Sequence, residues 1–393
     1  MEEQPRIINS LLDNDFYKFT MQNAVTKLFP TARVRYRFVN RGGHKFPEGF
    51  AQALRRQVDM MATLQLSADE KRYFARKCRY LDPVYLDFLS GYRYDPSEVH
   101  IEQQGGDLEV IIEGYWYRTI LWEVSLMSVI SELYYIMTGL RRVDDAQVRE
   151  ITRRKMEAYK GMDIKIAEFG TRRRHSYRVQ ELVVAALQQY GGTNYIGTSN
   201  VRLAMDYNVI PIGTHAHEWF MFHAAHFGYK MANRAGLDNW VNVYHGDLGI
   251  ALSDTFTTDV FINSFDRKFA KLFDGVRHDS GDPLKFIDKI TAHYKSMNID
   301  PRSKTIIFSD ALTPDTVRRI ADYCRDKIGM SFGIGTNFTN DVGLEALNMV
   351  IKMSDAFTEN GVWTPTVKLS DAEGKYTGDP QAIELAKAIL SIR

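Results

Sequence analysis

The sequence predicts an α/β protein, with an irregular, TIM-like α/β barrel of about seven strands beside a smaller α+β domain. From about residue 145 onwards, short apolar strands alternate with amphipathic helices. Polar or basic side chains follow one predicted strand after another, as they do at the carboxyl ends of parallel barrel strands. A chain of 393 residues also exceeds one typical domain, so we expect two.

Residues 1–118 are predicted to form the smaller α+β domain. Asp13 is expected to cap its first helix, and residues 32–41 alternate apolar side chains with arginines, which is typical of a half-buried strand. The expected helices are residues 13–28, 50–64, 68–80 and a long buried one at 120–137, and the expected strands are residues 32–41 and 108–115.

Residues 119–347 are predicted to form the barrel domain. Its expected strands are residues 164–169, 195–197, 209–213, 248–252, 273–276, 305–308 and 331–334, with crossover helices at 176–190, 283–297 and 313–328. Two further strands, 348–354 and 364–370, break this rhythm, and Asn360-Gly361 has the composition of a hairpin turn between them. We expect residues 348–393 to join the first domain.

Composition limits the classes of partner. A net charge of +1, with 45% hydrophobic and 25% charged residues, gives no global attraction to nucleic acids or acidic membranes. No window approaches ~18 uninterrupted apolar residues, so no membrane span is predicted. The two cysteines, Cys78 and Cys324, lie far apart and favour a reducing cytoplasm over a disulfide framework.

Two histidines, His215 and His217, lie where the strand at 209–213 passes into a helix. Ligands bind at such strand ends in α/β proteins. Three interpretations stay open: structural histidines satisfied by the backbone, a His-x-His metal pair, or a nucleophile or acid/base with Glu218 beside it.

The other strand ends carry groups suited to a phosphorylated sugar. Gly335 and Thr336, after the last predicted barrel strand, can offer N–H and hydroxyl donors to a phosphate. Arg172 heads a run of three arginines that suits a second anion, and Asp279 can bind sugar hydroxyls or a hydrated Mg²⁺. Further polar strand-end residues are Thr198, Ser199, Arg277, Ser309 and Asp310.

Six linked motifs, in unbroken order from about residue 8 to residue 370, resemble the nicotinate phosphoribosyltransferase family. They are Leu12-Asp-Asn-Asp-Phe-Tyr-Lys, Glu168-Phe-Gly-Thr-Arg-Arg, Gly197-Thr-Ser-Asn, Ala216-His-Glu-Trp, Arg277-His-Asp-Ser-Gly-Asp-Pro and Phe332-Gly-Ile-Gly-Thr. The resemblance implies that nicotinate and 5-phosphoribosyl 1-pyrophosphate give nicotinate mononucleotide and pyrophosphate in NAD salvage. It also implies ATP as a co-substrate, Mg²⁺ with the donor and ATP, and a cytoplasmic homodimer with shared active sites.

Roles follow from the resemblance position by position. It implies ring stacking on Phe169, ring closure by Tyr17 of a partner subunit, carboxylate contacts from Ser199 and Arg277, ribose binding by Asp279, 5′-phosphate binding by Gly335 and Thr336, an anion contact from Arg172, and phosphorylation of His217 by ATP. The catalytic set is then His217, Arg277 and Asp279, with Thr198, Ser309 and Asp310 as further substrate contacts. His215 departs from the family, whose members often carry an uncharged residue there.

The chemistry is consistent with this set. Displacement of pyrophosphate from a ribose carbon passes through a cationic, oxocarbenium-like state, so no protein nucleophile on carbon is needed. Two alternatives are a metal-dependent barrel hydrolase using His215 and His217 with Asp279, and a non-catalytic phosphosugar-binding regulator. A nicotinamide phosphoribosyltransferase is the nearest alternative, and Ser199 bears on that choice because its hydroxyl can donate to a carboxylate.

Overall fold

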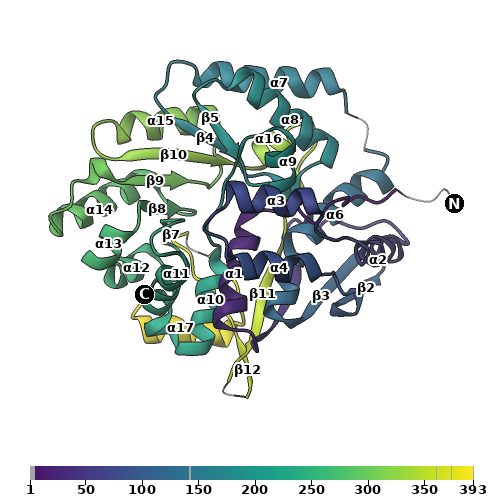
Figure 1. Ribbon diagram of the computed structural model, residues 1–393, viewed down its shortest axis with the longest axis horizontal. Helices are drawn as coiled ribbons and strands as arrows, with labels where there is room; N and C mark the ends of the chain where they lie inside the picture. The colour runs from purple at the N-terminus through teal and green to yellow at the C-terminus, as the bar shows by residue number, and fades with distance from the viewer. Residues whose placement is uncertain (1–4, 141–142, 360, 373, 393) are drawn as a thin grey trace.

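The computed structural model describes residues 5–140, 143–359, 361–372 and 374–392, and it contains two β-sheets (Figure 1). The larger sheet consists of β4 (Lys165–Glu168), β5 (Tyr195–Thr198), β6 (Ile210–Pro211), β7 (Ile250–Leu252), β8 (Gly275–His278), β9 (Thr305–Phe308) and β10 (Gly329–Ile334). The smaller sheet consists of β1 (Arg33–Asn40), β2 (Val99–Gln104), β3 (Asp107–Tyr115), β11 (Met349–Phe357) and β12 (Trp363–Pro365).

The larger sheet is a curled half-barrel of seven parallel strands, in the order β6-β5-β4-β10-β9-β8-β7. The strands β6 and β7 are its two edges. Thr214, just after β6, bridges them, because its hydroxyl donates to the carbonyl of Ile250 in β7 at 3.1 Å. Thr20 of the first helix donates in turn to the carbonyl of Thr214 at 2.5 Å. The predicted fold class, an irregular α/β barrel of about seven strands beside a smaller α+β unit, is confirmed.

The smaller sheet is antiparallel and joins both ends of the chain, in the order β12-β11-β1-β3-β2. The strand β11 pairs with β1 and with β12. The residue Asn360 of the predicted hairpin turn lies outside the described residues. The strand β2 was not predicted, since three of its six residues, Glu102 to Gln104, are polar in succession. A boundary between two domains near residue 118 stays a prediction.

Helices surround both sheets. Those before the barrel are α1 (Phe16–Leu28), α2 (Phe50–Met61), α3 (Ala68–Lys77), α4 (Pro83–Gly91), the 3-10 turn η1 (Pro96–Glu98), α5 (Trp116–Thr119) and α6 (Trp122–Met137). The others are α7 (Asp145–Tyr159), η2 (Thr171–Arg173), α8 (Tyr177–Tyr190), α9 (Val201–Asp206), α10 (His217–Phe227), α11 (Tyr229–Tyr244), α12 (Thr258–Ser264), α13 (Arg267–Leu272), α14 (Pro283–Ser296), η3 (Pro301–Ser303), α15 (Pro314–Cys324), α16 (Thr336–Thr339) and α17 (Pro380–Leu390).

The first helix begins later than its capping signal suggests. Its N-cap is Asp15, and not Asp13 as predicted. Asp13 is used elsewhere, since both of its carboxylate oxygens accept from the guanidinium of Arg174, at 2.6 and 2.8 Å. Both side chains are almost fully buried, so this pair fastens the start of α1 to the barrel.

The segment Trp116–Met137, which spans α5 and α6, is long and apolar enough to cross a membrane by length and composition. The structure buries 83% of its most apolar window inside the protein. It therefore packs as a core segment here, and α6 contacts both α2 and the turn η2 of the barrel.

Candidate active site

The predicted site residues converge on a cavity of about 700 Å³ at the carboxyl ends of the barrel strands. Of the residues predicted to bind substrate or to act in catalysis, those lining it are Tyr17, Phe169, Arg172, Ser199, Arg277, Asp279, Ser309, Asp310, Gly335 and Thr336. An adjoining hollow of about 230 Å³ shares Tyr17, Arg172 and Asp279 with the cavity and adds His217. Strands distant in sequence meet here because they are parallel and end at one edge of the sheet.

An aromatic pair defines one part of the cavity. The ring of Phe169 lies against the backbone of β10, where a Cβ added to Gly333 would fall 2.5 Å from the ring. Tyr17 lies against Gly213, where an added Cβ would fall 2.8 Å from the Tyr17 nitrogen. Glycine at these two positions therefore lets the aromatic residues approach the strand ends.

Tyr17 lines the cavity of its own chain. Ring closure by Tyr17 of a partner subunit, which the resemblance implies, stays a prediction, but Tyr17 does have a route to the cavity of its own chain. The reason is the packing of α1, whose first turn lies against the opening between β6 and β7 and is held there by the bond from Thr20 to Thr214.

Arg277, Asp279 and Ser309 form one hydrogen-bonded group. Arg277 donates from Nε to Ser309 Oγ and from Nη2 to Asp279 Oδ1, both at 2.8 Å, and Ser309 donates to Asp279 at 2.5 Å. Burial opposes ionisation of Asp279, but Arg277, His217 and Lys368 together outweigh it and hold the Asp279 pKa well below its usual range. An ionised carboxylate is thus fixed beside a guanidinium in the cavity wall.

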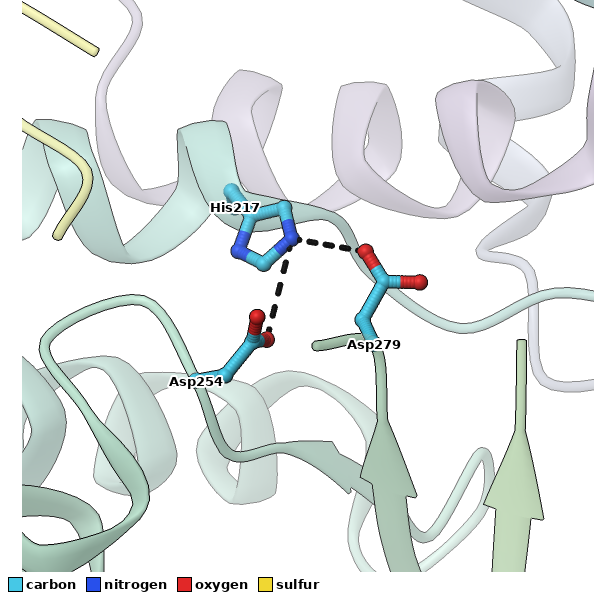
Figure 2. Close-up of side chains that lie close together, drawn as sticks. All are labelled: His217, Asp254 and Asp279. Carbon is cyan, nitrogen blue, oxygen red and sulfur yellow. Dashed lines mark hydrogen bonds and ion pairs between the residues drawn. The ribbon is translucent and has the colours of Figure 1, made fainter. Parts of the chain in front are cut away.

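His217 lies at the start of α10 and faces two carboxylates (Figure 2). Its Nε2 is 3.0 Å from Asp279 Oδ2 and 3.8 Å from Asp254 Oδ1, while its Nδ1 is 3.1 Å from Thr255 Oγ1. Lys368 places its Nζ 3.0 Å from the same Nε2. Burial, and then the charge of Lys368, lower the His217 pKa to about 4, so the imidazole is neutral near pH 7.

His217, Asp254 and Asp279 could together hold a metal ion, because one ligand atom from each lies within 4.8 Å of the others (Figure 2). Within the described part of the chain, the buried Asp254 Oδ1 has no hydrogen-bond partner. Mg²⁺ prefers carboxylate oxygens, so Asp254 and Asp279 fit a hydrated Mg²⁺. Asp254 follows the predicted strand at residues 248–252, but nothing in the sequence distinguishes it from other acidic residues at strand ends.

His215 is not part of this group. Its Nε2 accepts from the backbone N–H of Leu252 at 3.2 Å, and its ring packs edge-on against Trp240 with centroids 4.6 Å apart. The metal-pair interpretation of His215 and His217 is therefore wrong, and His215 is a buried structural residue. His215 and His217 do not converge on one metal ion, because the chain turns into α10 between them.

Two neighbouring hydroxyls at the end of β5 point to different places. Ser199 lines the cavity and donates to Asp15 Oδ1 at 2.6 Å. Thr198 is buried and donates instead to Glu168 Oε2 at 2.5 Å, so it supports the cavity floor and does not line the cavity as predicted. Burial raises the pKa of this Glu168 to about 7.

The three consecutive arginines also separate. Arg172 and Arg173 line the cavity, whereas Arg174 is fully buried and bound to Asp13. Arg174 therefore has no part in the cavity wall, although it follows Arg173 directly in sequence. Burial, and then the positive charge of the neighbouring Arg172, lower the pKa of Arg173 to about 10.

A parallel half-barrel with arginines, carboxylates and a glycine-lined loop at its strand ends is the arrangement of an α/β-barrel enzyme that binds phosphorylated sugars. Residues 164–392 match the nicotinate phosphoribosyltransferase (NAPRTase) family, and residues 12–131 match the NAPRTase N-terminal domain. The chain belongs to the nicotinate phosphoribosyltransferase family.

Relatives and solved structures agree over nearly the whole chain. A nicotinate phosphoribosyltransferase of Chromohalobacter salexigens is 63% identical over 98% of this chain and 99% of its own length. One from Desulforapulum autotrophicum is 50% identical over 98% of each chain. The crystal structure of nicotinate phosphoribosyltransferase from Porphyromonas gingivalis superposes with a TM-score of 0.96 at 47% identity, covering 98% of this chain and 100% of that one. The corresponding structure from Vibrio cholerae gives 0.92 at 33%, covering 99% and 95%.

Proposed function

We propose that this chain transfers the phosphoribosyl group of 5-phosphoribosyl 1-pyrophosphate to nicotinate, and that His217 transiently carries a phosphoryl group from ATP. The observation that carries the proposal is the link between the aromatic cavity and the histidine. Asp279 contacts Arg277 at 2.8 Å on one side and His217 at 3.0 Å on the other. A group bound at His217 would therefore act directly on the carboxylate that faces the sugar.

The pyridine ring of nicotinate fits between Phe169 and Tyr17, which both line the cavity. Arg277 supplies a cation for the nicotinate carboxylate. Ser199 has a hydroxyl where an acidic side chain would repel that carboxylate, which favours nicotinate over nicotinamide.

The transfer forms a bond between the ring nitrogen and the ribose C1, and the bond from C1 to the pyrophosphate oxygen breaks. The ring nitrogen already has a lone pair, so no base is required. Gly335 and Thr336 would bind the 5′-phosphate and Asp279 the ribose hydroxyls, while Arg172 faces the leaving pyrophosphate. Mg²⁺, which Asp254 and Asp279 would hold, supplies further positive charge against the leaving group.

The phosphoryl transfer needs a neutral imidazole, and the depressed pKa of His217 provides one. Nε2 forms a bond to the γ-phosphorus of ATP while the bond from that phosphorus to the bridging oxygen breaks, and ADP leaves with the electron pair. Lys368 and the N-terminus of α10 would stabilise the added negative charge. Water then hydrolyses the phosphohistidine and returns the free imidazole.

Incubation with γ-labelled ATP tests this proposal. The wild-type enzyme should acquire an acid-labile, base-stable phosphate, and His217→Ala should acquire none while still making some mononucleotide without a response to ATP. His215→Gln, which keeps an acceptor for the Leu252 N–H, should still be labelled. Label that persists in His217→Ala would refute the phosphohistidine.

Assays with nicotinate, nicotinamide and quinolinate, each with the phosphoribosyl donor, test the choice of acceptor. Product from nicotinate alone supports the proposal, and preferential use of nicotinamide would contradict the role of Ser199. We also propose that the enzyme acts in NAD salvage as a cytoplasmic homodimer. Two buried free thiols, Cys78 and Cys324, support a reducing compartment, and sedimentation equilibrium would measure the oligomeric state.

A further inference from the structure

The ammonium group of Lys18 lies between two buried glutamates. Its Nζ is 2.5 Å from Glu123 Oε2 and 2.5 Å from Glu218 Oε2. The side chain of Lys18 is 0% exposed and each glutamate is 6% exposed. Two of its three N–H donors are thus used on carboxylates inside the protein.

Each residue of this cluster comes from the first turn of a different helix. Lys18 lies in α1, Glu123 in α6 and Glu218 in α10. Both glutamates are favourable there, because the N-terminus of a helix carries a partial positive charge. Lys18 lacks that advantage at the start of α1, so its burial depends on the two carboxylates.

The cluster connects three predicted site residues that do not follow each other in sequence. Tyr17 precedes Lys18, and His217 precedes Glu218. Arg172 joins through Glu123, whose Oε1 lies 3.6 Å from Arg172 Nη1. These two cations and two carboxylates balance in charge, and the buried Lys352 adds a further cation whose charge acts on Glu123. Removing one of them leaves an uncompensated charge in the interior, which is costly.

We infer that Lys18 is a positioning residue that sets the place of Arg172 through Glu123 and the place of His217 through Glu218. Lys18 itself touches no substrate in this scheme. The inference rests on the proposed function, because it assigns Arg172 to the pyrophosphate group and His217 to the phosphoryl group. It adds that two separate catalytic tasks depend on one buried ammonium.

The roles of Glu123 and Glu218 can be tested separately, because the two glutamates have different partners besides Lys18. Glu123 contacts both Lys18 and Arg172, whereas Glu218 contacts Lys18 and, at 3.4 Å each, the hydroxyl of Tyr36 and the indole N–H of Trp116. Loss of the Glu123 charge should free Arg172 from its partner. Loss of the Glu218 charge should instead loosen the first turn of α10.

Glu123→Gln and Glu218→Gln form a matched pair, because each removes one negative charge from the same buried cluster with almost no change in shape. We expect Glu123→Gln to raise the KM for the phosphoribosyl donor about tenfold and to keep its response to ATP. We expect Glu218→Gln to reduce phosphate labelling of His217 about tenfold and to keep the donor KM within about twofold. A purely structural cluster predicts the same change in both variants, and that result, or no change in either, overturns the inference.

The triple variant Lys18→Met, Glu123→Gln, Glu218→Gln tests Lys18 itself. It removes all three of these charges and leaves Arg172 without Glu123, but the side chain of Arg172 is 38% exposed to solvent, so the variant should fold where Lys18→Met alone fails. We expect it to combine both defects, and a wild-type donor KM with wild-type labelling would show that Lys18 positions nothing. If this variant does not fold, the comparison of Glu123→Gln with Glu218→Gln decides whether the inference holds. Wild-type enzyme that lacks labelling by ATP would contradict the proposed function, while the donor KM of Glu123→Gln would still test the inference.

Discussion

Lys368 places its Nζ 3.0 Å from Nε2 of His217, although 151 positions separate the two residues in sequence. An ammonium group can only donate, so a hydrogen bond from Lys368 requires Nε2 to carry its lone pair, whereas a hydrogen bond to the ionised Asp279, 3.0 Å from the same atom, requires an N–H there. The two contacts therefore belong to different tautomers of the neutral ring. In the tautomer that accepts from Lys368, the ring proton lies on Nδ1, where the hydroxyl of Thr255 accepts it at 3.1 Å, and the free nitrogen faces the hollow with a cation beside it.

Replacement of Lys368 by methionine should weaken phosphorylation of His217. The cation that favours the lone pair and offsets the incoming phosphate is lost, so labelling by γ-labelled ATP should fall about tenfold or more. Lys368→Arg should retain an intermediate level. Lys387→Met is the control, because Lys387 pairs with Glu384 on the surface helix α17. Undiminished labelling in Lys368→Met would show that the contact has no role in the transfer.

Gly333→Ala should displace the ring of Phe169. The added methyl group would fall 2.5 Å from the ring, and the ring must move because the methyl is attached to strand β10. We expect the KM for nicotinate to rise about tenfold, the amount that loss of ~1.4 kcal/mol of stacking would cause, with little change in the donor KM. Gly91→Ala is the control, since nothing lies within 4 Å of its added Cβ. An unchanged nicotinate KM would remove Phe169 from the ring site.

Ser199→Asp should select against nicotinate. A second carboxylate would lie beside Asp15, which Ser199 now contacts at 2.6 Å, and would face the carboxylate of the substrate. Like charges in contact cost several kcal/mol, so kcat/KM for nicotinate should fall by about a hundredfold or more. Ser199→Ala tests loss of the hydroxyl without added charge and should be milder. Circular dichroism establishes that each variant is folded, and unchanged nicotinate kinetics in Ser199→Asp would place Ser199 outside the site.

His215→Gln should flatten the acid side of the stability profile. Burial, and then the charge of Arg277, lower the His215 pKa to about 3, whereas the unfolded chain titrates near 6.5. Between these values the unfolded state binds more protons, so His215 makes the folded protein less stable as pH falls through this window. Between about pH 6 and pH 5 the wild type should lose about 1 kcal/mol more than His215→Gln in urea unfolding. Parallel profiles would contradict a buried neutral His215.

The sequence by itself determined the class of fold and most members of the site. Seven short apolar runs separated by amphipathic helices predict parallel strands, and parallel strands carry their carboxyl ends to one edge. Residues at the ends of such runs or just after them, including Phe169, Arg277 and Asp279, therefore had to lie near one another. Local periodicity is enough for this step, because each strand and helix follows from its own residues.

Only the tertiary structure decided which neighbours act on those residues. Tyr17, Lys18 and Lys368 come from outside the barrel pattern, and their contacts depend on how α1 and the C-terminal segment pack on the half-barrel. Residues close in sequence also have different environments. Ser199 and Arg172 line the cavity, whereas Thr198 and Arg174 are buried behind it. His217 lines the adjoining hollow, whereas His215 packs in the core. The physical reason is that burial and pairing of a polar side chain depend on the backbone direction at that residue and on distant partners, and local periodicity contains neither.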